Sequence, residues 1–503
     1  MMLLGFDLGT SSIKAALLDA ETGEPLASAS SPASEMSVSA PRPGWAEQDP
    51  ETWWKHVVAA TAMLRDAHPF DPRSVAGIGI SYQMHGLVLV DRDLRVLRPA
   101  ILWCDGRAVE SGDRAAASIG PDLCFRRLLN LPGNFTASKI LWVRENEPGV
   151  FARVRHALLP GDWLALRMTG EAAATASGLS EMILWDYEEN APAGFVLERL
   201  GLPASILPPL VPTFGPQGRL TPPAARALGL APETPVSYRA GDQPNNALSL
   251  NVLEPGEMAA TAGTSGVIYA VSGRPSSDSR NRVNPFLHVN HGPGKPRIGV
   301  LLCVNGTGSL YRWLRRLLAE TAGAEVSYDR LNAIAAAAPA GSDGLAVLPF
   351  GNGAERILEN RDPGASLHNL SLNIHGLPHV ARAATEGIAF ALRFGAEILR
   401  DMGIEVRAAR AGHANLFRSE LFASTFASAV GAPVELFDTD GAQGAARGAG
   451  IGAGAFETFE EAFRGLRRIR AVDPDPALAQ PLDDAYGRWK EALGRILGSA
   501  VRS

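Results

Sequence analysis

The sequence contains GFDLGTSSIKAALLD at residues 5–19 and a similar stretch, TAGTSGVIYAVS, at residues 261–272. Each places a small-residue turn, Gly-Thr-Ser, between two apolar runs, a pattern typical of two strands joined by a tight turn. Glycine lets a backbone approach a ligand closely, and successive N–H groups with Thr and Ser hydroxyls can surround an anion. One such stretch could be an ordinary hairpin. Two of them, at corresponding places in the two halves of the chain, predict a pair of phosphate-binding loops.

A chain of 503 residues is too long for one hydrophobic core, so two large domains are expected. With 46% hydrophobic and 20% charged residues, the composition is that of a globular protein. A net charge of −6 gives no basic surface, so we expect neither nucleic acid nor an anionic membrane as a partner. No apolar run reaches the ~18 residues of a membrane span, and Asp7 interrupts the apolar start, which argues against a signal peptide. Three scattered cysteines without metal-ligand spacing favour free thiols in a reducing cytoplasm.

Strand-like and helical patterns alternate in both halves, which predicts an α/β fold with two related domains. Helical periodicity is expected over residues 50–66 and again over residues 380–402. We place the domain boundary near residue 253, giving domains 1–253 and 254–503. The stretch GAGIGA, at 448–453, matches a dinucleotide fingerprint only loosely and lacks a preceding strand, so a closely packed helix is the better interpretation.

Four further stretches carry a family resemblance. They are GWAEQDPETWW (44–54), GISYQMHGLVLVD (79–91), RPAILWCDGR (98–107) and AGDQ (240–243). Together with the two Gly-Thr-Ser stretches they resemble the FGGY carbohydrate kinases, and among them the xylulokinases most closely. The similarity runs in order over nearly the whole chain. It implies the actin-like (ribonuclease H-like) ATPase fold, in which two duplicated α/β domains enclose ATP and sugar in a central cleft.

The resemblance also implies roles for individual residues. Phosphoryl transfer needs alignment, neutralisation of charge and a base for the attacking hydroxyl. Asp242 matches the family's catalytic aspartate, although an aspartate after Gly241 could also be a turn residue. Asp7 is expected to hold Mg–ATP through water, since hard divalent cations take oxygen ligands. The residues expected around ATP are Gly9, Thr10, Ser11, Ser12, Lys14, Gly263, Thr264, Ser265, Gly412 and Asn415. For Lys14, an exposed strand lysine is an equal alternative.

The sugar is expected to contact Met84 and His85, which match the substrate-binding Met-His pair of xylulokinase-like members. A histidine after a buried strand could instead be a satisfied core side chain. Gln83, Trp103 and Gln243 are secondary candidates beside Asp242, and Trp103 would more often be core by composition alone.

Three departures from the family pattern bear on the substrate and the nucleotide. The chain has Gly-Asp-Gln at 241–243, the form of glycerol kinases, where xylulokinases have Gly-Asp-Asn. The adenosine stretch is a short AGHANLF at 411–417, and Glu355-Arg356 lacks the Thr-Pro-His that usually follows.

The resemblance implies ATP-dependent phosphorylation of D-xylulose to D-xylulose 5-phosphate. Alternatives are another ketose or polyol (ribulose, erythrulose or glycerol) and, from a different class, a non-catalytic actin-like nucleotide sensor. Asp242 together with the Gln-Met-His stretch argues against the sensor, which needs no base. Family members are often dimers, so a homodimer is expected. The two halves are expected to close around their substrates.

Overall fold

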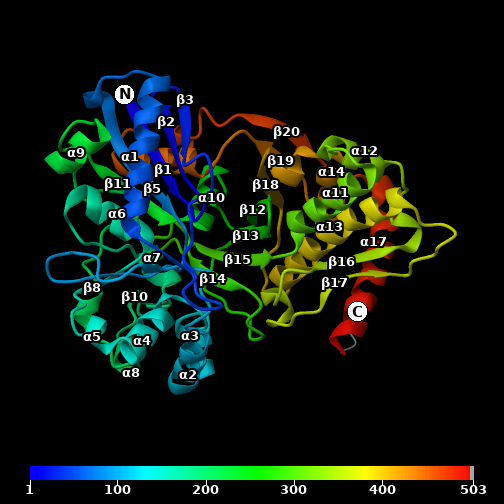
Figure 1. Cartoon of the computed structure of the whole chain (residues 1–503), viewed down its shortest axis with the longest axis horizontal. Helices are drawn as coiled ribbons and strands as arrows, with labels where there is room; N and C mark the ends of the chain where they lie inside the picture. The colour runs from blue at the N-terminus through cyan, green and yellow to red at the C-terminus, as the bar shows by residue number, and fades with distance from the viewer. Residues whose placement is uncertain (499–503) are drawn as a thin grey trace.

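The computed structural model describes residues 1–498, which form two α/β lobes side by side (Figure 1). The first lobe is built on a five-stranded sheet in the order β11-β5-β1-β2-β3. Strand β2 runs antiparallel to both β1 and β3, whereas β5 and β11 run parallel to β1. The strands are β1 (Met2–Leu8), β2 (Ile13–Asp19), β3 (Pro25–Ser31), β5 (Val75–Tyr82) and β11 (Val236–Gly241).

The second lobe is built on a seven-stranded sheet in the order β14-β15-β13-β12-β18-β19-β20. Its five strands β15-β13-β12-β18-β19 repeat both the order and the directions of β3-β2-β1-β5-β11. The predicted duplication is therefore confirmed in the topology. The strands are β12 (Glu257–Ala262), β13 (Gly266–Ser272), β14 (Asn284–Leu287), β15 (Ile298–Val304), β18 (Ala408–Gly412), β19 (Val434–Phe437) and β20 (Arg468–Val472).

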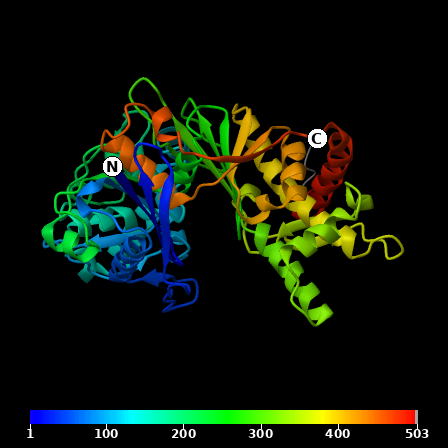
Figure 2. The same cartoon turned by 90° about the horizontal axis from the view of Figure 1, so that it is seen from above.

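One helix of the second half packs on the sheet of the first. Helix α15 (Gly441–Gly452) lies against β1 and β5, and Figure 2 shows this orange segment beside the blue strands. The strands offer glycines at the contact: a Cβ at Gly5 would lie 2.0 Å from the Ala442 carbonyl oxygen, and one at Gly79 would lie 1.9 Å from that of Ala445. The helix backbone can therefore approach the sheet directly. The interpretation of the glycine-rich stretch as a packed helix is confirmed.

The two lobes are joined by helix α10 (Asp242–Ser249) and the link of residues 250–256 that leads into β12. The predicted boundary at 253 falls in this link. Helices α10 and α15 are equivalent in the two halves, since each follows the fifth strand of its repeat, and they pack against each other. The residues at the start of both helices consequently lie where the lobes meet.

The remaining helices cover the sheets and fill the long connections. Helix α1 (Pro50–Ala67) packs on β2 and β3, and α13 (Leu377–Asp401) packs on β13, so both helices predicted by periodicity are present. Within residues 1–498, no helix combines the length and apolar character needed to cross a bilayer. The other α-helices are α2 (Val109–Ile119), α3 (Pro121–Arg127), α4 (Thr136–Asn146), α5 (Pro148–Phe151), α6 (Pro160–Thr169), α7 (Ala176–Glu181), α8 (Gly194–Arg199), α9 (Pro222–Leu228), α11 (Thr307–Ala322), α12 (Tyr328–Ala336), α14 (Glu420–Val430), α16 (Phe459–Ala462) and α17 (Pro476–Leu497). The short strands outside the two sheets are β4 (Glu47–Gln48), β6 (Val88–Val90), β7 (Ala100–Ile101), β8 (His156–Leu158), β9 (Trp185–Asp186), β10 (Ala191–Pro192), β16 (Ala346–Phe350) and β17 (Gly364–His368).

Candidate functional site

The first Gly-Thr-Ser turn joins β1 to β2, and the Gly9 N–H closes it by donating to the Ser12 carbonyl oxygen (3.1 Å). Asp7 lies two residues before the turn, and its carboxylate accepts a hydrogen bond from the Ser81 hydroxyl (2.7 Å). Lys14 is exposed and stands directly opposite Asp7 on β2, so the two side chains share one face of the sheet. Burial raises the pKa of Asp7, and the nearby charge of Lys14 partly opposes that rise.

Thr10 ties this turn to two of the predicted sugar-binding residues. Its hydroxyl donates to Gln83 Oε1 (2.9 Å) and accepts from Trp103 Nε1 (3.1 Å). Trp103 is 52% exposed, so the structure places it beside the turn and not in the core that composition alone would favour. The Gln83 Nε2 atom is buried and has no partner in the described chain. An unpaired buried donor and an exposed indole therefore lie next to the first turn.

Asp242 is the first residue of α10, directly after β11. Burial, reinforced by the negative charge of Asp7, raises the pKa of its carboxyl to about 7. A carboxyl that titrates near neutral pH suits general-base catalysis. Met84 packs behind the same strand end, because a Cβ at Gly241 would lie 2.6 Å from Met84 Cγ. The predicted base and one predicted sugar contact thus lie together.

The carboxylates here suit a divalent cation that is bound together with phosphate. Asp440, the N-cap of α15, adds a further negative charge that raises the pKa of Asp7. Gly441 leaves room beside Asp7, since a Cβ there would lie 2.6 Å from Asp7 Oδ2. Within residues 1–498 no three or more ligating side chains cluster as an all-protein metal cage. Mg²⁺ is usually held by one or two carboxylates plus water and substrate phosphates, so the residues present fit it.

His85 follows Met84 and is largely buried. Its ring packs against Phe135 and Phe286, with centroids 4.8 and 5.3 Å away, and Phe286 belongs to β14 of the second lobe. Burial lowers the pKa of His85 to about 3, so the imidazole is neutral. The Nδ1–H donates to the Glu181 carbonyl oxygen (3.1 Å), which leaves Nε2 as a hydrogen-bond acceptor. Packing and a free acceptor are both present, so the histidine is part core and part candidate ligand.

Two charged residues behind His85 escaped the sequence prediction. Glu181 is 2% exposed, and its carboxylate accepts from the Tyr82 hydroxyl (2.7 Å) and the His85 N–H (3.2 Å). Lys139 is 0% exposed and donates to the His85 carbonyl oxygen (2.9 Å). The sequence offered one signal for them: each is an ionisable residue within a largely apolar stretch, Lys139 in SKILWV and Glu181 in SGLSEMILW.

The second Gly-Thr-Ser turn joins β12 to β13 and rests on the start of α11. The Gly308 N–H donates to the Gly263 carbonyl oxygen (2.9 Å), and the Ser309 N–H donates to that of Thr264 (3.1 Å). Gly308 permits this approach, because a Cβ there would lie 2.2 Å from the Gly263 oxygen. Helix α11 therefore holds the second turn, through these two backbone N–H groups and the Thr307 hydroxyl, which donates to the same two carbonyl oxygens (3.2 and 3.3 Å).

A cavity of about 470 Å³ opens beside the second turn, a volume within the range of small-ligand sites. It includes three of the residues expected to bind ATP: Gly263, Thr264 and Asn415. Gly412 lies at the end of β18 and is not part of the cavity wall. The other lining residues are Ala262, Gly308, Tyr311, Arg312, Tyr328, Asp329, Asn332, Leu416, Arg418 and Ser419.

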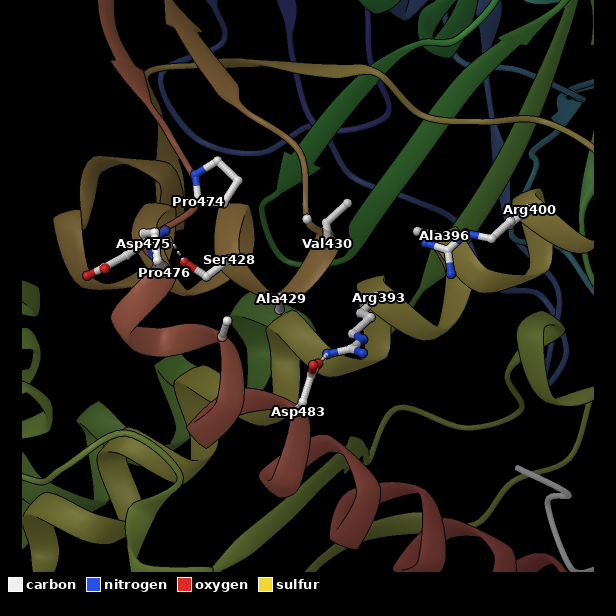
Figure 3. A pocket seen from close by; sticks show the side chains of 12 residues that line it. Arg393, Ala396, Arg400, Ser428, Ala429, Val430, Pro474, Asp475, Pro476 and Asp483 are labelled. Atoms are coloured by element: carbon white, nitrogen blue, oxygen red, sulfur yellow. Dashed lines mark hydrogen bonds and ion pairs between the residues drawn. The ribbon is translucent and has the colours of Figure 1, made fainter.

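A second cavity, of about 370 Å³, lies between α13, α14 and α17 (Figure 3). Arg393 pairs with Asp483 across it at 2.6 Å, and the Ser428 hydroxyl accepts from the Asp475 N–H. None of the predicted site residues line this cavity. It is separate from both turns.

Comparisons with known proteins agree with this geometry. Residues 2–249 match the N-terminal domain of the FGGY family of carbohydrate kinases, and residues 258–455 match its C-terminal domain. The chain is 32% identical to the xylulose kinase of Escherichia coli K12, covering 98% of this chain and 99% of that one, and 31% identical to that of Bacillus subtilis 168, covering 100% and 99%.

Solved structures agree as well. A xyloylose kinase from Brucella ovis superimposes with a TM-score of 0.88 at 31% identity, and the xylulose kinase of Rhodospirillum rubrum with 0.88 at 29%, each over 99% of both chains. The predicted two-domain actin-like fold is thus confirmed. The family implies sugar and ATP as substrates and, in general, a divalent metal. The chain belongs to the FGGY family of carbohydrate kinases and is an ATP-dependent sugar kinase.

Proposed function

We propose that the protein phosphorylates D-xylulose at its terminal hydroxyl, forming D-xylulose 5-phosphate, with Mg²⁺ as the divalent metal. The carrying observation is that the carboxyl of Asp242, with its pKa raised to about 7 by burial and by the charge of Asp7, directly follows Gly241, which packs against Met84. Base, metal-binding carboxylate and sugar contact are thereby assigned to one place. The choice of xylulose over other sugars is supported by the names of the similar kinases.

Asp242 acts as the general base. Its ionised carboxylate accepts the proton as the sugar oxygen forms a bond to the γ-phosphorus and the bond from phosphorus to the ADP oxygen breaks. The raised pKa keeps the carboxylate basic enough to take that proton, while leaving a large ionised fraction near neutral pH. Met84 behind Gly241 fixes the strand end from which Asp242 projects.

Asp7 would hold Mg²⁺ through water, and the bound ion would neutralise phosphate charge. Glycine N–H groups and hydroxyls of both turns would surround the transferring phosphate, and the adenosine would occupy the cavity beside Asn415. Lys14, which faces Asp7, adds a positive charge at the same edge.

The sugar hydroxyls would pair with polar atoms that lack partners in the described chain. Gln83 Nε2 is a buried donor and Gln243 Oε1 a buried acceptor, and each costs free energy when unpaired. A site with such atoms favours a ligand that satisfies them and disfavours one that lacks the matching hydroxyl. His85 Nε2 adds an acceptor, and the exposed indole of Trp103 a flat apolar surface.

A coupled ADP-release assay across D-xylulose, D-ribulose, erythrulose and glycerol tests the proposal. We expect the highest kcat/KM with D-xylulose, and a phosphate on its terminal carbon in the NMR spectrum of the product. A higher kcat/KM with glycerol would assign Gln243 its glycerol kinase role and reject xylulose. Turnover at background with every sugar would favour a nucleotide sensor.

Two further expectations stay proposals: a homodimer and a cytoplasmic location. The three cysteines are free thiols in the structure, which suits a reducing compartment. Light scattering during size exclusion distinguishes a mass of two chains from a mass of one.

A further inference from the structure

His85 has an unusual backbone conformation for its residue type. Its φ is 60°, in the left-handed region that a residue with a Cβ rarely adopts. Such a residue is strained unless its surroundings hold it, and strain of this kind concentrates at functional sites. Glycine could adopt this φ freely, so the chain retains an imidazole here at a conformational cost.

Glu181, the last residue of α7, holds the backbone N–H of His85. One carboxylate oxygen accepts the His85 N–H at 3.2 Å, and the other accepts the Tyr82 hydroxyl at 2.7 Å, which fixes the carboxylate. The Glu181 backbone carbonyl accepts the Nδ1–H of the His85 ring at 3.1 Å. One residue thus sets both the peptide orientation and the ring tautomer of His85.

Lys139, on α4, holds the carbonyl side. Its ammonium donates to the His85 carbonyl oxygen at 2.9 Å and to the Asn134 carbonyl oxygen at 2.8 Å. No carboxylate forms an ion pair with it among residues 1–498, because the nearby Asp105 is bound by Arg107 and by the Ala46 N–H. A fully buried ammonium without a counter-ion is costly, and burial accordingly lowers the pKa of Lys139 to about 7. The hydrogen bonds of Lys139 are made to two backbone carbonyl oxygens, those of His85 and Asn134, and they hold the backbone at these residues.

We infer that Lys139 and Glu181 are positioning residues for sugar binding: they hold the backbone of His85 in its left-handed conformation from both sides, and Glu181 fixes Nε2 as the ring atom that accepts a sugar hydroxyl. The inference rests on the proposed sugar contact of His85. It explains why two buried ionisable side chains meet the backbone of one residue, Glu181 at its N–H and Lys139 at its carbonyl oxygen. The inference requires a neutral ring, because an imidazole with Nδ1–H and a free Nε2 is unprotonated. Burial and the nearby Lys139 lower the pKa of His85 to about 3, which meets this requirement.

The test compares KM for D-xylulose in four variants: Lys139→Met, His85→Ala, the double variant, and Lys55→Met as a charge-matched control on the exposed face of α1. We expect Lys139→Met to raise this KM about 10- to 100-fold, the range that release of a strained residue allows. The KM for ATP should change far less. Lys139→Arg, which keeps the donors, should recover part of the loss, and Lys55→Met should resemble the parent protein.

The double variant decides the route of the effect. If Lys139 acts through the His85 ring, Lys139→Met adds less than about twofold once the ring is gone, because coupled residues are not additive. If the increase in KM of the double variant equals the product of the two single increases, the inference is wrong and Lys139 has only a general packing role. If Lys139→Met does not fold, Glu181→Gln replaces it, with the same expected loss and the same dependence on His85.

The two proposals fail separately. An unchanged KM in His85→Ala rejects the sugar contact itself, and the inference with it. A raised KM in His85→Ala with an unchanged KM in Lys139→Met rejects only the positioning role. A crystal structure of Lys139→Met gives a second readout: we expect φ of His85 to leave the left-handed region, and an unchanged φ would contradict the inference.

Discussion

The two Gly-Thr-Ser turns occupy the same place in the two repeats but have different surroundings. Each joins the first two strands of its repeat, and the register aligns Asp7 of the first with Thr261 of the second. The first turn is held by side chains, through the Thr10 hydroxyl to Gln83 and Trp103. The second is held by α11, through two backbone N–H groups and the Thr307 hydroxyl, and lines the 470 Å³ cavity. We therefore infer that the first turn, besides meeting the phosphate, orients two predicted sugar-binding side chains, while the second also borders the cavity proposed for the nucleotide.

The helices that follow the fifth strands show the same division. Asp242 is the first residue of α10, whose N-cap is Gly241, whereas Asp440 is itself the N-cap of α15 and accepts the Gln443 N–H at 2.9 Å. A carboxylate engaged in a cap is stabilised where it lies, while an uncapped one remains available to a substrate. The two equivalent helices thus begin with aspartates at different positions, and only Asp242 is proposed as the base.

Exchanging each aspartate for asparagine gives the largest expected contrast. Asp242→Asn should lower kcat by about 10²- to 10⁴-fold, because the amide cannot accept the proton. Asp440→Asn should cost far less, since asparagine is also a good N-cap. Steady-state kinetics with D-xylulose and ATP measure both. Near-parental kcat in Asp242→Asn would remove that residue from the mechanism.

The sugar side should respond to loss of the His85 ring. His85→Ala should raise KM for the best sugar about 5- to 150-fold, the loss expected when a hydrogen-bonded partner is left unpaired. Far-ultraviolet circular dichroism and the melting temperature serve as controls. Lower stability with unaltered kinetics would show that the histidine is only a core side chain.

Matched valine substitutions distinguish the two turns more finely. Thr10→Val removes the hydroxyl that bridges Gln83 and Trp103, so it should raise KM for sugar about tenfold. Thr264→Val lies at the nucleotide cavity and should raise KM for ATP by a similar factor without changing the one for sugar. Identical patterns in the two variants would reject the division between the halves.

The smallest effect concerns stability and pH. Folding raises the pKa of Asp242 from its ordinary value of about 4 to about 7, so the folded protein holds this proton more tightly than the unfolded chain. The stability gained is full below the unfolded pKa and is lost as the pH rises through 7. Asparagine does not ionise, so Asp242→Asn does not lose this stability as the pH rises. The melting temperature of the variant minus that of the parent should therefore increase between pH 5 and pH 8. A difference that is constant with pH would contradict the raised pKa.

The sequence predicted those features that short motifs carry. Both turns and the helices at 50–66 and 380–402 were visible because the residues concerned lie close together in the chain. Asp242 was singled out by the family resemblance, and its role as the base stays a prediction. The packing of α15 on the first sheet was not, because the glycines that admit it, Gly5 and Gly79, are hundreds of residues away.

The residues around His85 escaped prediction for the same reason. Glu181 and Lys139 reach it across 96 and 54 residues, so only the folded chain brings both side chains to the backbone of His85. The exposure of Trp103 also depends on tertiary structure, since composition favours a core position for tryptophan.

The central claim is that both turns act on one phosphate, although they belong to different lobes. They can do so only if the lobes approach each other, and closure would also exclude water as a competing acceptor. Sugar contacts near Met84 and Asp242 lie where the lobes meet, so sugar should favour the closed form. Small-angle X-ray scattering of the free protein, and of the protein with D-xylulose and a non-hydrolysable ATP analogue, measures this directly. We predict a smaller radius of gyration in the ternary complex and slow ATP hydrolysis without sugar. Equal radii, together with ATP hydrolysis that does not depend on sugar, would contradict the claim.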